Sequence, residues 1–185
     1  MIWFTSDLHL GHANIIPACM RPFRDVDEMN ETLIWNFNAV VRRDDTVYIL
    51  GDLSFKVGAE NVPGLVARLN GKKILIRGNH DKRSCDGLYD HAADFERVTV
   101  EGMDLSLMHY PMLSWPGRRR GAVQLHGHIH ADATYNETNR DLGILRYDVG
   151  VDANNFYPVS AKQIRDFLGL DDPATLARIR DWMDE

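Results

Sequence analysis

The chain has 185 residues, 44% of them hydrophobic, and its 21 basic and 27 acidic residues give a net charge of −6. These values are typical of a globular domain with a sizeable core, and the acidic balance disfavours strong nonspecific binding to nucleic acid. Two cysteines, Cys19 and Cys85, cannot form a disulfide framework, and neither a signal-peptide pattern nor a membrane-length apolar stretch is present. We therefore expect a single cytoplasmic domain over residues 1–185 with no membrane contact.

Short runs of apolar and β-branched residues recur along the chain, and each run ends at Gly, Asp, Asn or His. Such runs have the length and composition of β-strands. The predicted strands cover residues 2–6, 46–50, 73–77, 97–100, 105–110, 122–127 and 144–151.

Helices are predicted over 27–42, over 59–69, from Ser160 to Gly169, and from Asp172 onward. Apolar residues at helical spacing predict the first two. Ser160 and Gln163 have the spacing of a capping box, and Asp172-Pro173 supplies an N-cap and a first-turn proline. The first half alternates strand and helix, which favours a parallel sheet flanked by helices. The second half runs strand after strand, which indicates hairpins or a second sheet.

Five predicted strands are followed by side chains with oxygen or imidazole groups. In α/β proteins, sites form beyond the carboxyl ends of strands, so these side chains can converge in space. Carboxylates, an amide and imidazoles, without a thiolate, suit divalent ions such as manganese, iron or zinc. The seven candidate ligands are Asp7, His9, Asp52, Asn79, His109, His128 and His130. Seven ligands suit two ions that share a carboxylate, and we expect Gly51, Gly78 and Gly127 to permit sharp turns at the strand ends.

In order, the motifs Asp-x-His, Gly-Asp, Gly-Asn-His-Asp, a lone His and Gly-His-x-His resemble those of the calcineurin-like metallophosphoesterase superfamily. They run from Asp7 to His130. The stretch TSDLHLGHANII, followed by RPF and EMN, resembles the small stand-alone members of bacteria and phages. The resemblance implies an α/β fold in the form of a four-layer sandwich, with two mixed β-sheets flanked by helices. It also implies two divalent metal ions, with manganese first and iron, zinc, nickel or magnesium as alternatives.

The resemblance assigns a role to each motif residue by its position. The implied ligands are Asp7, His9 and His130 for the first metal, and Asn79, His109 and His128 for the second, with Asp52 bridging both. His80 would stabilise the transition state or protonate the leaving oxygen, oriented by Asp81. A metal-bridging hydroxide would attack phosphorus in line, with no covalent intermediate.

Basic residues near the motifs are candidates for binding the substrate phosphate. We expect such contacts from His12, Arg21, Arg118 and Arg119, the last two in a run of arginines between two ligand motifs. The alternatives are a helix start for His12 and a solvated loop for the arginine run. Tyr110 and Trp115 flank that loop and either stack on a nucleobase or pack in the core. His126 has no ligand role in the motif, and we expect a structural or outer-sphere role for it.

We therefore expect a phosphoesterase that acts on small substrates, with a preference for phosphodiesters such as cyclic or small nucleotides. A compact chain with no capping domain leaves an open site, which tolerates a second ester arm. Phosphomonoesterase and dinucleoside-polyphosphate hydrolase activities are the alternatives within the same chemistry. A non-catalytic interaction module is the alternative outside it, and the complete ligand set argues against that function. A mononuclear amidohydrolase would open with His-x-His instead of Asp-x-His. The sequence does not indicate the oligomeric state.

Overall fold

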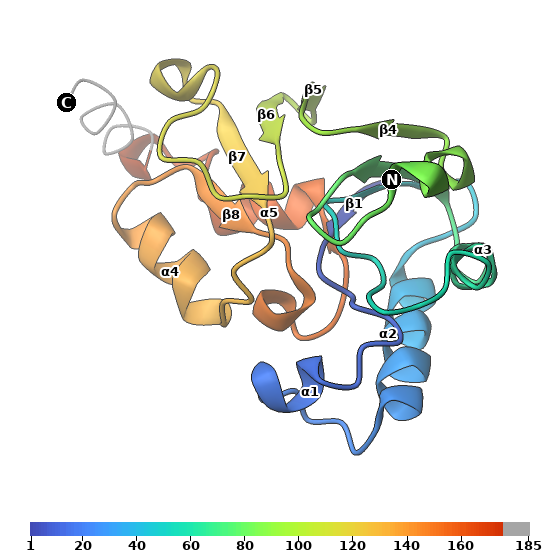
Figure 1. The fold of residues 1–185 in the computed structure, drawn as a ribbon. Helices are drawn as coiled ribbons and strands as arrows, with labels where there is room; N and C mark the ends of the chain where they lie inside the picture. Colours follow the sequence, from blue (N-terminus) through green and yellow to red (C-terminus); the bar gives the residue numbers. More distant parts are fainter. Residues whose placement is uncertain (176–185) are drawn as a thin grey trace.

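The computed structural model describes residues 1–175, and a five-stranded sheet forms one half of its centre (Figure 1). Its strands are β1 (Ile2–Thr5), β2 (Thr46–Ile49), β3 (Lys72–Ile76), β4 (His91–Ala93) and β9 (Val159–Ser160). They lie in the order β4-β3-β2-β1-β9. The first four strands are parallel, and β9 is antiparallel to β1. The carboxyl ends of β1, β2 and β3 therefore meet at one edge.

A four-stranded sheet forms the other half, as the run of predicted strands in the second half of the chain indicates. It consists of β5 (Glu96–Val100), β6 (Met103–Leu107), β7 (Val123–His126) and β8 (Arg146–Asp148), in that order. The β5-β6 hairpin turns on Glu101 and Gly102, both with positive φ, as a two-residue hairpin requires. The pairs β6-β7 and β7-β8 are parallel, so this sheet is mixed as well.

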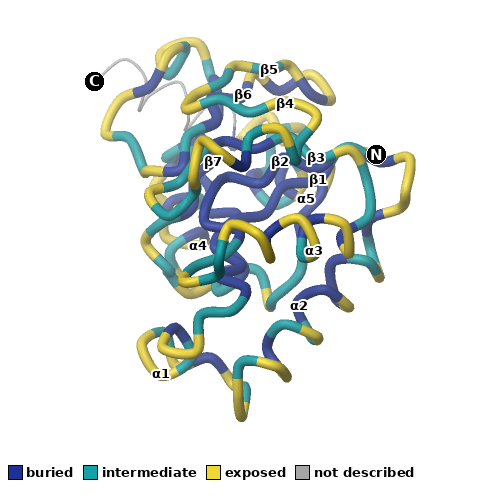
Figure 2. The backbone as a smooth tube through the Cα atoms, turned by 45° about the vertical axis from the view of Figure 1, so that its right-hand side comes forward, coloured by how far each residue is buried: buried dark blue, intermediate teal, exposed yellow. Residues whose placement is uncertain are grey.

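Alternating residues of the central strands enter two separate hydrophobic cores. Phe4 of β1 and Ile76 of β3 face the second sheet, whereas Trp3 of β1 and Leu75 of β3 face the other way. Both faces of the five-stranded sheet are thus buried, which explains the nearly continuous apolar runs in the sequence (Figure 2). Full burial of such a side chain contributes about 1.5–3 kcal/mol.

Helices cover the outer faces of the two sheets. The helices are α1 (Ile15–Ala18), α2 (Val26–Val40), α3 (Val62–Ala67), α4 (Ala133–Asp141) and α5 (Ala161–Phe167), with short 3-10 turns η1 (Arg83–Leu88), η2 (Arg118–Arg120) and η3 (Val151–Asn154). Helices α2 and α3 pack on the five-stranded sheet, and α4 lies against the edge strand β8. The predicted α/β fold, with two mixed sheets flanked by helices, is confirmed.

The helix boundaries follow local capping chemistry. Asp25 caps α2, its carboxylate accepting from the Glu28 amide, so the helix begins one residue earlier than predicted. The predicted capping box of Ser160 and Gln163 starts α5. The Asp172 carboxylate accepts from the amides of residues 174 and 175, as an N-cap does. The rest of that predicted helix lies outside the described residues.

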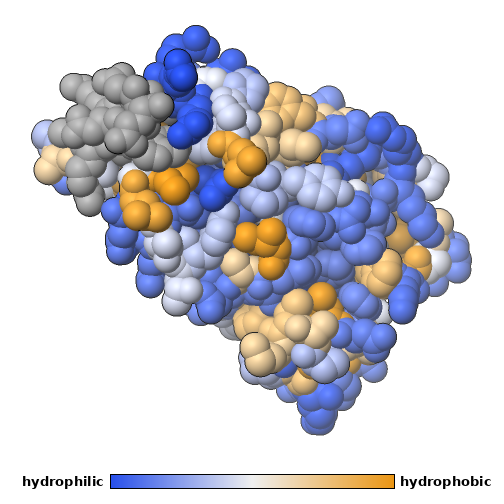
Figure 3. Space-filling model, turned by 60° about the vertical axis from the view of Figure 1, so that its left-hand side comes forward, coloured by the Kyte–Doolittle hydropathy of each residue, from blue (hydrophilic) through white to orange (hydrophobic). Residues whose placement is uncertain are grey.

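The helices and the exposed surface can be compared with what a membrane-spanning helix requires. Within residues 1–175, no helix is both long and apolar enough to cross a bilayer. On the face shown in Figure 3, hydrophobic residues appear as separate small groups within a largely hydrophilic surface. Scattered exposed apolar residues of this kind are ordinary on a folded protein.

Candidate active site

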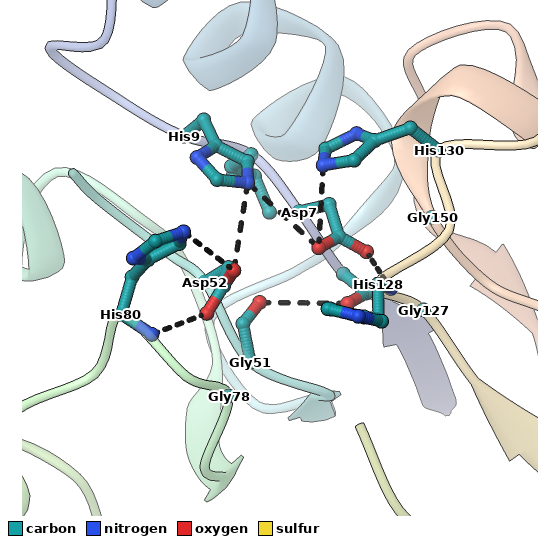
Figure 4. Close-up of polar contacts among 12 residues, drawn as sticks. Asp7, His9, Gly51, Asp52, Gly78, His80, Gly127, His128, His130 and Gly150 are labelled. Atoms are coloured by element: carbon teal, nitrogen blue, oxygen red, sulfur yellow. Dashed lines mark hydrogen bonds and ion pairs between the residues drawn. The ribbon is translucent and has the colours of Figure 1, made fainter. Parts of the chain in front are cut away.

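The predicted ligand motifs from both sheets meet at the carboxyl ends of the strands (Figure 4). Backbone hydrogen bonds join the loops that follow the strands. The Asp7 amide donates to Gly51 O at 3.1 Å, and the Gly127 amide donates to His109 O at 2.9 Å. An isolated bridge between Ser6 and residue 150 links the end of β1 to the region after β8. This edge of the fold therefore places side chains from distant parts of the sequence around one centre.

The Asp52 carboxylate lies between two imidazoles from different sheets. Its Oδ2 atom is 3.6 Å from His9 Nε2 and 3.6 Å from His109 Nε2. Asp7 Oδ1 is 3.9 Å from His9 Nε2 and 4.0 Å from His130 Nε2. In each of the groups Asp7-His9-His130 and Asp7-Asp52-His109, one ligand atom per residue lies within 4.8 Å of the others, and Cys19-His130-Asp152 forms a further group of this kind beside them.

The remaining two predicted ligands lie beside His109. Asn79 Oδ1 is 3.0 Å from His109 Nε2. The ring of His128 is 5.0 Å from the ring of His109, and its backbone amide donates to Asp7 Oδ2 at 2.8 Å. The structure therefore brings all seven predicted ligands into one cluster.

The donor set fits divalent metal ions. Asp7 Oδ1 and His9 Nε2 are buried and have no hydrogen-bond partner within the described part of the chain. A buried polar atom without a partner costs about 1–3 kcal/mol, and an ion at the centre of the cluster would remove that cost. Burial, reinforced by the nearby His130, lowers the pKa of His9 to about 2, so its imidazole is neutral at physiological pH and can donate a lone pair.

Outer hydrogen bonds turn one nitrogen of His109 and one of His130 toward the cluster. His109 Nδ1 donates to Leu50 O at 2.7 Å, which directs Nε2 toward Asp52. His130 Nδ1 lies 2.8 Å from Asp152 Oδ2, which directs its Nε2 toward Asp7. Burial lowers the pKa of His130, but the hydrogen bond to Asp152 and the charge of Asp7 outweigh it and raise the pKa overall. Histidine ligands in metal sites commonly have such partners.

Asp152 is a site residue that the sequence analysis missed. It directly follows the predicted strand over 144–151, so it shows the same pattern, a strand followed by a carboxylate, that identified Asp7 and Asp52. The family motifs run from Asp7 to His130 and do not include it. Because it fixes the His130 ring, Asp152 is an outer partner of the cluster.

The expectation that Arg21 binds the substrate phosphate is wrong. Its side chain is fully buried, and its Nε and one terminal nitrogen each donate to the Asp152 carboxylate at 2.8 Å. The other donations go to the backbone carbonyls of Asp7 and Leu8 and to the sulfur of Met29. Arg21 therefore holds Asp152, and through it His130, from beneath the first ligand loop.

The His80 and Asp81 side chains have different partners, and among the described residues they form no hydrogen bond with each other, contrary to expectation. The His80 ring is half-buried, with Nε2 3.8 Å from Asp52 Oδ2, and its amide donates to Asp52 Oδ1 at 2.9 Å. The Asp81 carboxylate accepts from the amides of Asp52 and Gly78, both at 2.8 Å. Asp81 therefore organises the backbone of two ligand loops, whereas we had expected it to orient the His80 ring.

Most of the predicted ligands have an uncommon backbone conformation. Non-glycine residues with positive φ are rare and cost on the order of 1–3 kcal/mol each, and they cluster at functional sites. Five of the seven predicted ligands have positive φ: Asp7 (58°), His9 (52°), Asp52 (54°), His128 (75°) and His130 (48°). Tight left-handed turns directly after the strands therefore aim these side chains at a common centre.

The three site glycines are required for two different reasons. Gly51 has a φ of +91°, in agreement with the expected sharp turn. Gly78 and Gly127 do not have positive φ, and the sharp-turn explanation is wrong for them. A Cβ on Gly127 would lie 2.1 Å from Ser6 Oγ and 2.2 Å from Asp7 Oδ2. A Cβ on Gly78 would lie 2.2 Å from Asp52 Oδ1. These two positions are glycine because the ligand carboxylates occupy the space.

Gly127→Ala should displace the Asp7 carboxylate and weaken metal binding while the sheets stay folded. Overpacking of this kind typically costs about 1–3 kcal/mol. The measurement is metal content after dialysis, together with the thermal unfolding midpoint. Gly64→Ala is the matched control, because a Cβ there meets nothing within 4 Å. Equal metal content in the two variants would contradict the close approach.

The other predicted substrate-binding residues lie at different distances from the cluster. His12 lies beside it, with Nδ1 3.4 Å from His9 Nδ1 and its ring 4.4 Å from that of Phe55. Arg118 and Arg119 belong to η2 and line a separate hollow, which contains none of the seven ligands. The structure thus leaves His12 as a candidate and does not bring the two arginines to the centre.

Of the aromatic side chains near the arginine run, Tyr110 lies beside the cluster and Trp115 is part of the core. Tyr110 is 39% exposed, and its ring lies edge-on to that of His128 at 4.6 Å. Trp115 is buried, and its Nε1 donates to Ala122 O at 2.7 Å, so it packs in the core. His126 is buried next to Tyr135 of α4, with 3.2 Å between His126 Nε2 and the phenol oxygen, which is a structural position.

The two mixed sheets, with a candidate metal centre at the carboxyl ends of their strands, define the class of fold and site to which this chain belongs. Residues 1–142 match the family model described as calcineurin-like phosphoesterase, and the chain belongs to this family. Its members use divalent metal ions and hydrolyse phosphoester bonds. The family predicted from the sequence motifs is confirmed.

Several relatives are similar over nearly the whole chain. An uncharacterised protein of Methanocaldococcus jannaschii is 39% identical over 160 residues, which cover 86% of each chain. The gene 66 protein of Mycobacterium phage L5 is 31% identical, covering 82% of this chain and 86% of its own. The crystal structure of a protein of unknown function from Aquifex aeolicus has a TM-score of 0.73 and 26% identity, and covers 90% of this chain and 98% of its own.

Proposed function

We propose that this protein is a dinuclear metal-dependent phosphodiesterase that acts on small phosphoesters such as cyclic or small nucleotides. The supporting observation is the position of Asp52, whose Oδ2 atom lies 3.6 Å from His9 Nε2 and 3.6 Å from His109 Nε2. A carboxylate between two groups of nitrogen and oxygen ligands is the arrangement that a pair of ions sharing one ligand requires.

The proposed ligand sets are Asp7, His9 and His130 for one ion and Asn79, His109 and His128 for the other, with Asp52 shared. Two divalent ions there would lower the pKa of a shared water molecule and offset the charge of the phosphate. Manganese is our first choice, with iron, zinc, nickel and magnesium as alternatives, because all seven ligands offer oxygen or nitrogen.

The chain's own groups would prepare the site for substrate. His9 is neutral because burial lowers its pKa, and Arg21 and Asp152 hold the His130 ring in place. The half-buried His80 ring stands at the edge of the cluster, close enough to exchange a proton with a leaving oxygen. Its backbone amide, bound to Asp52, fixes the position of that ring relative to the shared carboxylate.

Two hollows favour a diester over a monoester. One, of about 380 Å³, is lined in part by Asn79 and His80. The other, of about 530 Å³, is lined in part by His130 and Asp152. In Figure 4, His80 and His130 lie on opposite sides of the Asp52 and Asp7 carboxylates. A phosphate at the cluster would have room for an ester arm in the hollow beside His80, and the hollow beside His130 is a candidate place for the second.

Hydrolysis of two chromogenic esters by the manganese-reconstituted protein tests this proposal. Bis-p-nitrophenyl phosphate should be cleaved faster than p-nitrophenyl phosphate, and a chelator should abolish the activity. Faster cleavage of the monoester would replace the diesterase by a phosphomonoesterase. If neither ester is cleaved, bis-nucleoside polyphosphates test the hydrolase alternative. A metal-loaded protein that cleaves none of them would be an interaction module.

A further inference from the structure

The hollow beside His80 is large and has an extensive apolar wall. Proton transfer from His80 to a leaving group needs neither feature. The apolar wall consists of Phe55, Val57, Val62, Leu75, Cys85 and Tyr89. Leu75 is 1% exposed, and Val62 and Cys85 are 7% and 9% exposed, so the floor of the hollow belongs to the hydrophobic core. The lining also includes polar residues such as Asn79, His80 and Asp81, so the hollow combines an apolar wall with a few polar groups, as ligand pockets commonly do.

Aromatic rings connect this hollow to the ligand cluster. The Phe55 ring lies 4.0 Å from the His80 ring, at 48°, and also contacts His9 edge-on at 6.3 Å. Asn79 and His80 line the hollow as well, so it opens directly beside the proposed second metal site. A group bound in the hollow could therefore belong to the same molecule as a phosphate at the metal centre.

Two lysines stand at the mouth of the hollow. Lys56 and Lys82 both line it and both are exposed. Lys56 Nζ lies 5.5 Å from the centre of the Phe55 ring, and neither ammonium pairs with a carboxylate within residues 1–175. In an acidic protein, two unpaired cations here favour the approach of an anionic ligand.

We propose that this hollow is a specificity subsite for a planar aromatic arm of the phosphoester substrate, of which a nucleobase is the natural example. Phe55 and Tyr89 would flank the ring, Val62 and Leu75 would form the floor, and the lysines would face the phosphate side. At about 380 Å³ the hollow is near the small end of ligand pockets, which suits one nucleoside-sized group. This inference rests on the proposed phosphoesterase function.

Paired phosphonates test the subsite without any turnover, because their P–C bond is not a substrate for hydrolysis. Phenylphosphonate and ethylphosphonate would be titrated into the manganese-loaded full chain by calorimetry. The phenyl compound should bind about tenfold more tightly or better, the range that aromatic stacking gives. Val62→Phe fills the hollow and should bring the affinity ratio close to one. Leu65→Phe, on the same helix but outside the lining, is the matched control and should keep the ratio.

Each outcome has a definite meaning. Equal affinity for the two phosphonates in the unchanged protein would overturn the subsite while leaving the metal centre intact. If the ratio survives in Val62→Phe, the aromatic arm binds elsewhere and the subsite is again overturned. Phe55→Leu gives a second test should Val62→Phe fail to fold, with a smaller ratio expected. Failure of both phosphonates to bind would overturn the phosphate centre itself, and the subsite with it.

Discussion

Asp52→Asn should abolish phosphoester hydrolysis and reduce the bound metal at both proposed sites. The carboxylate lies 3.6 Å from the Nε2 atoms of His9 and His109, so its charge faces both groups of ligands. The amide keeps the size of the side chain but carries no charge and has one oxygen fewer. Losing an outer partner of a metal ligand costs roughly 10–100-fold in affinity or activity, and loss of the shared ligand should cost more.

Metal analysis and the rate of bis-p-nitrophenyl phosphate cleavage measure this effect. Asp104→Asn is the control, since that aspartate is exposed on β6 and accepts a hydrogen bond from Thr99 on the neighbouring strand. The Asp52 amide, which donates to Asp81, is unaffected by the change, so the ligand loops should keep their shape. A variant that retains two ions and normal turnover would show that Asp52 is not the shared ligand.

Much of this site was predictable because sheet topology converts sequence order into spatial proximity. Asp7, Asp52 and Asn79 each follow one of three neighbouring parallel strands, and strands of that kind end at the same edge. The alternation of Trp3 and Phe4 between two cores likewise follows from the two-residue period of a strand. Residue type and position after a strand were therefore enough to select side chains that the fold brings together as candidate ligands.

Two of the elements that were missed, α4 and β9, lack a local pattern. Helix α4 has the sequence ATYNETNRD, with no apolar stripe, and is held by Asn136, whose amide group both donates to and accepts from the backbone of Asp148 in β8. Strand β9 has two residues, and it exists because it pairs with Phe4 and its neighbour in β1. Both elements form because of tertiary contacts, so a local stretch of sequence does not predict them.

The errors about Arg21 and Asp81 have a common cause. Charged side chains near an active-site motif are expected to face the substrate, but each of these two satisfies buried groups of the protein itself. Arg21 donates to Asp152, to two backbone carbonyls and to the Met29 sulfur, and Asp81 accepts from two loop amides. Which way a charged side chain turns depends on unpaired polar groups that only the folded chain brings near it.

His80→Ala should leave both metal ions bound and slow catalysis by roughly 10²–10⁴-fold, the usual contribution of a general acid or base. The His80 ring is half-buried, with Nε2 3.8 Å from Asp52 Oδ2, at the edge of the cluster. Its amide, which binds Asp52 Oδ1, remains in the variant. The shared carboxylate should therefore keep its position, so the loss falls on proton transfer and not on metal binding.

A series of aryl methyl phosphate diesters distinguishes proton donation from a structural role. If His80 protonates the leaving oxygen, the rate deficit of the variant should grow as the leaving phenol becomes a weaker acid, and should be smallest for p-nitrophenol. His91→Ala is the matched control, because that histidine is largely exposed on β4 and its ring lies beside Glu96, with 3.7 Å between Nε2 and the carboxylate. A deficit of the same size for every leaving group would assign His80 to stabilisation of the phosphate, since that interaction does not depend on the leaving group. Loss of metal from His80→Ala would instead place the ring among the ligands, and the division between metal-binding and proton-transferring histidines would have to be redrawn.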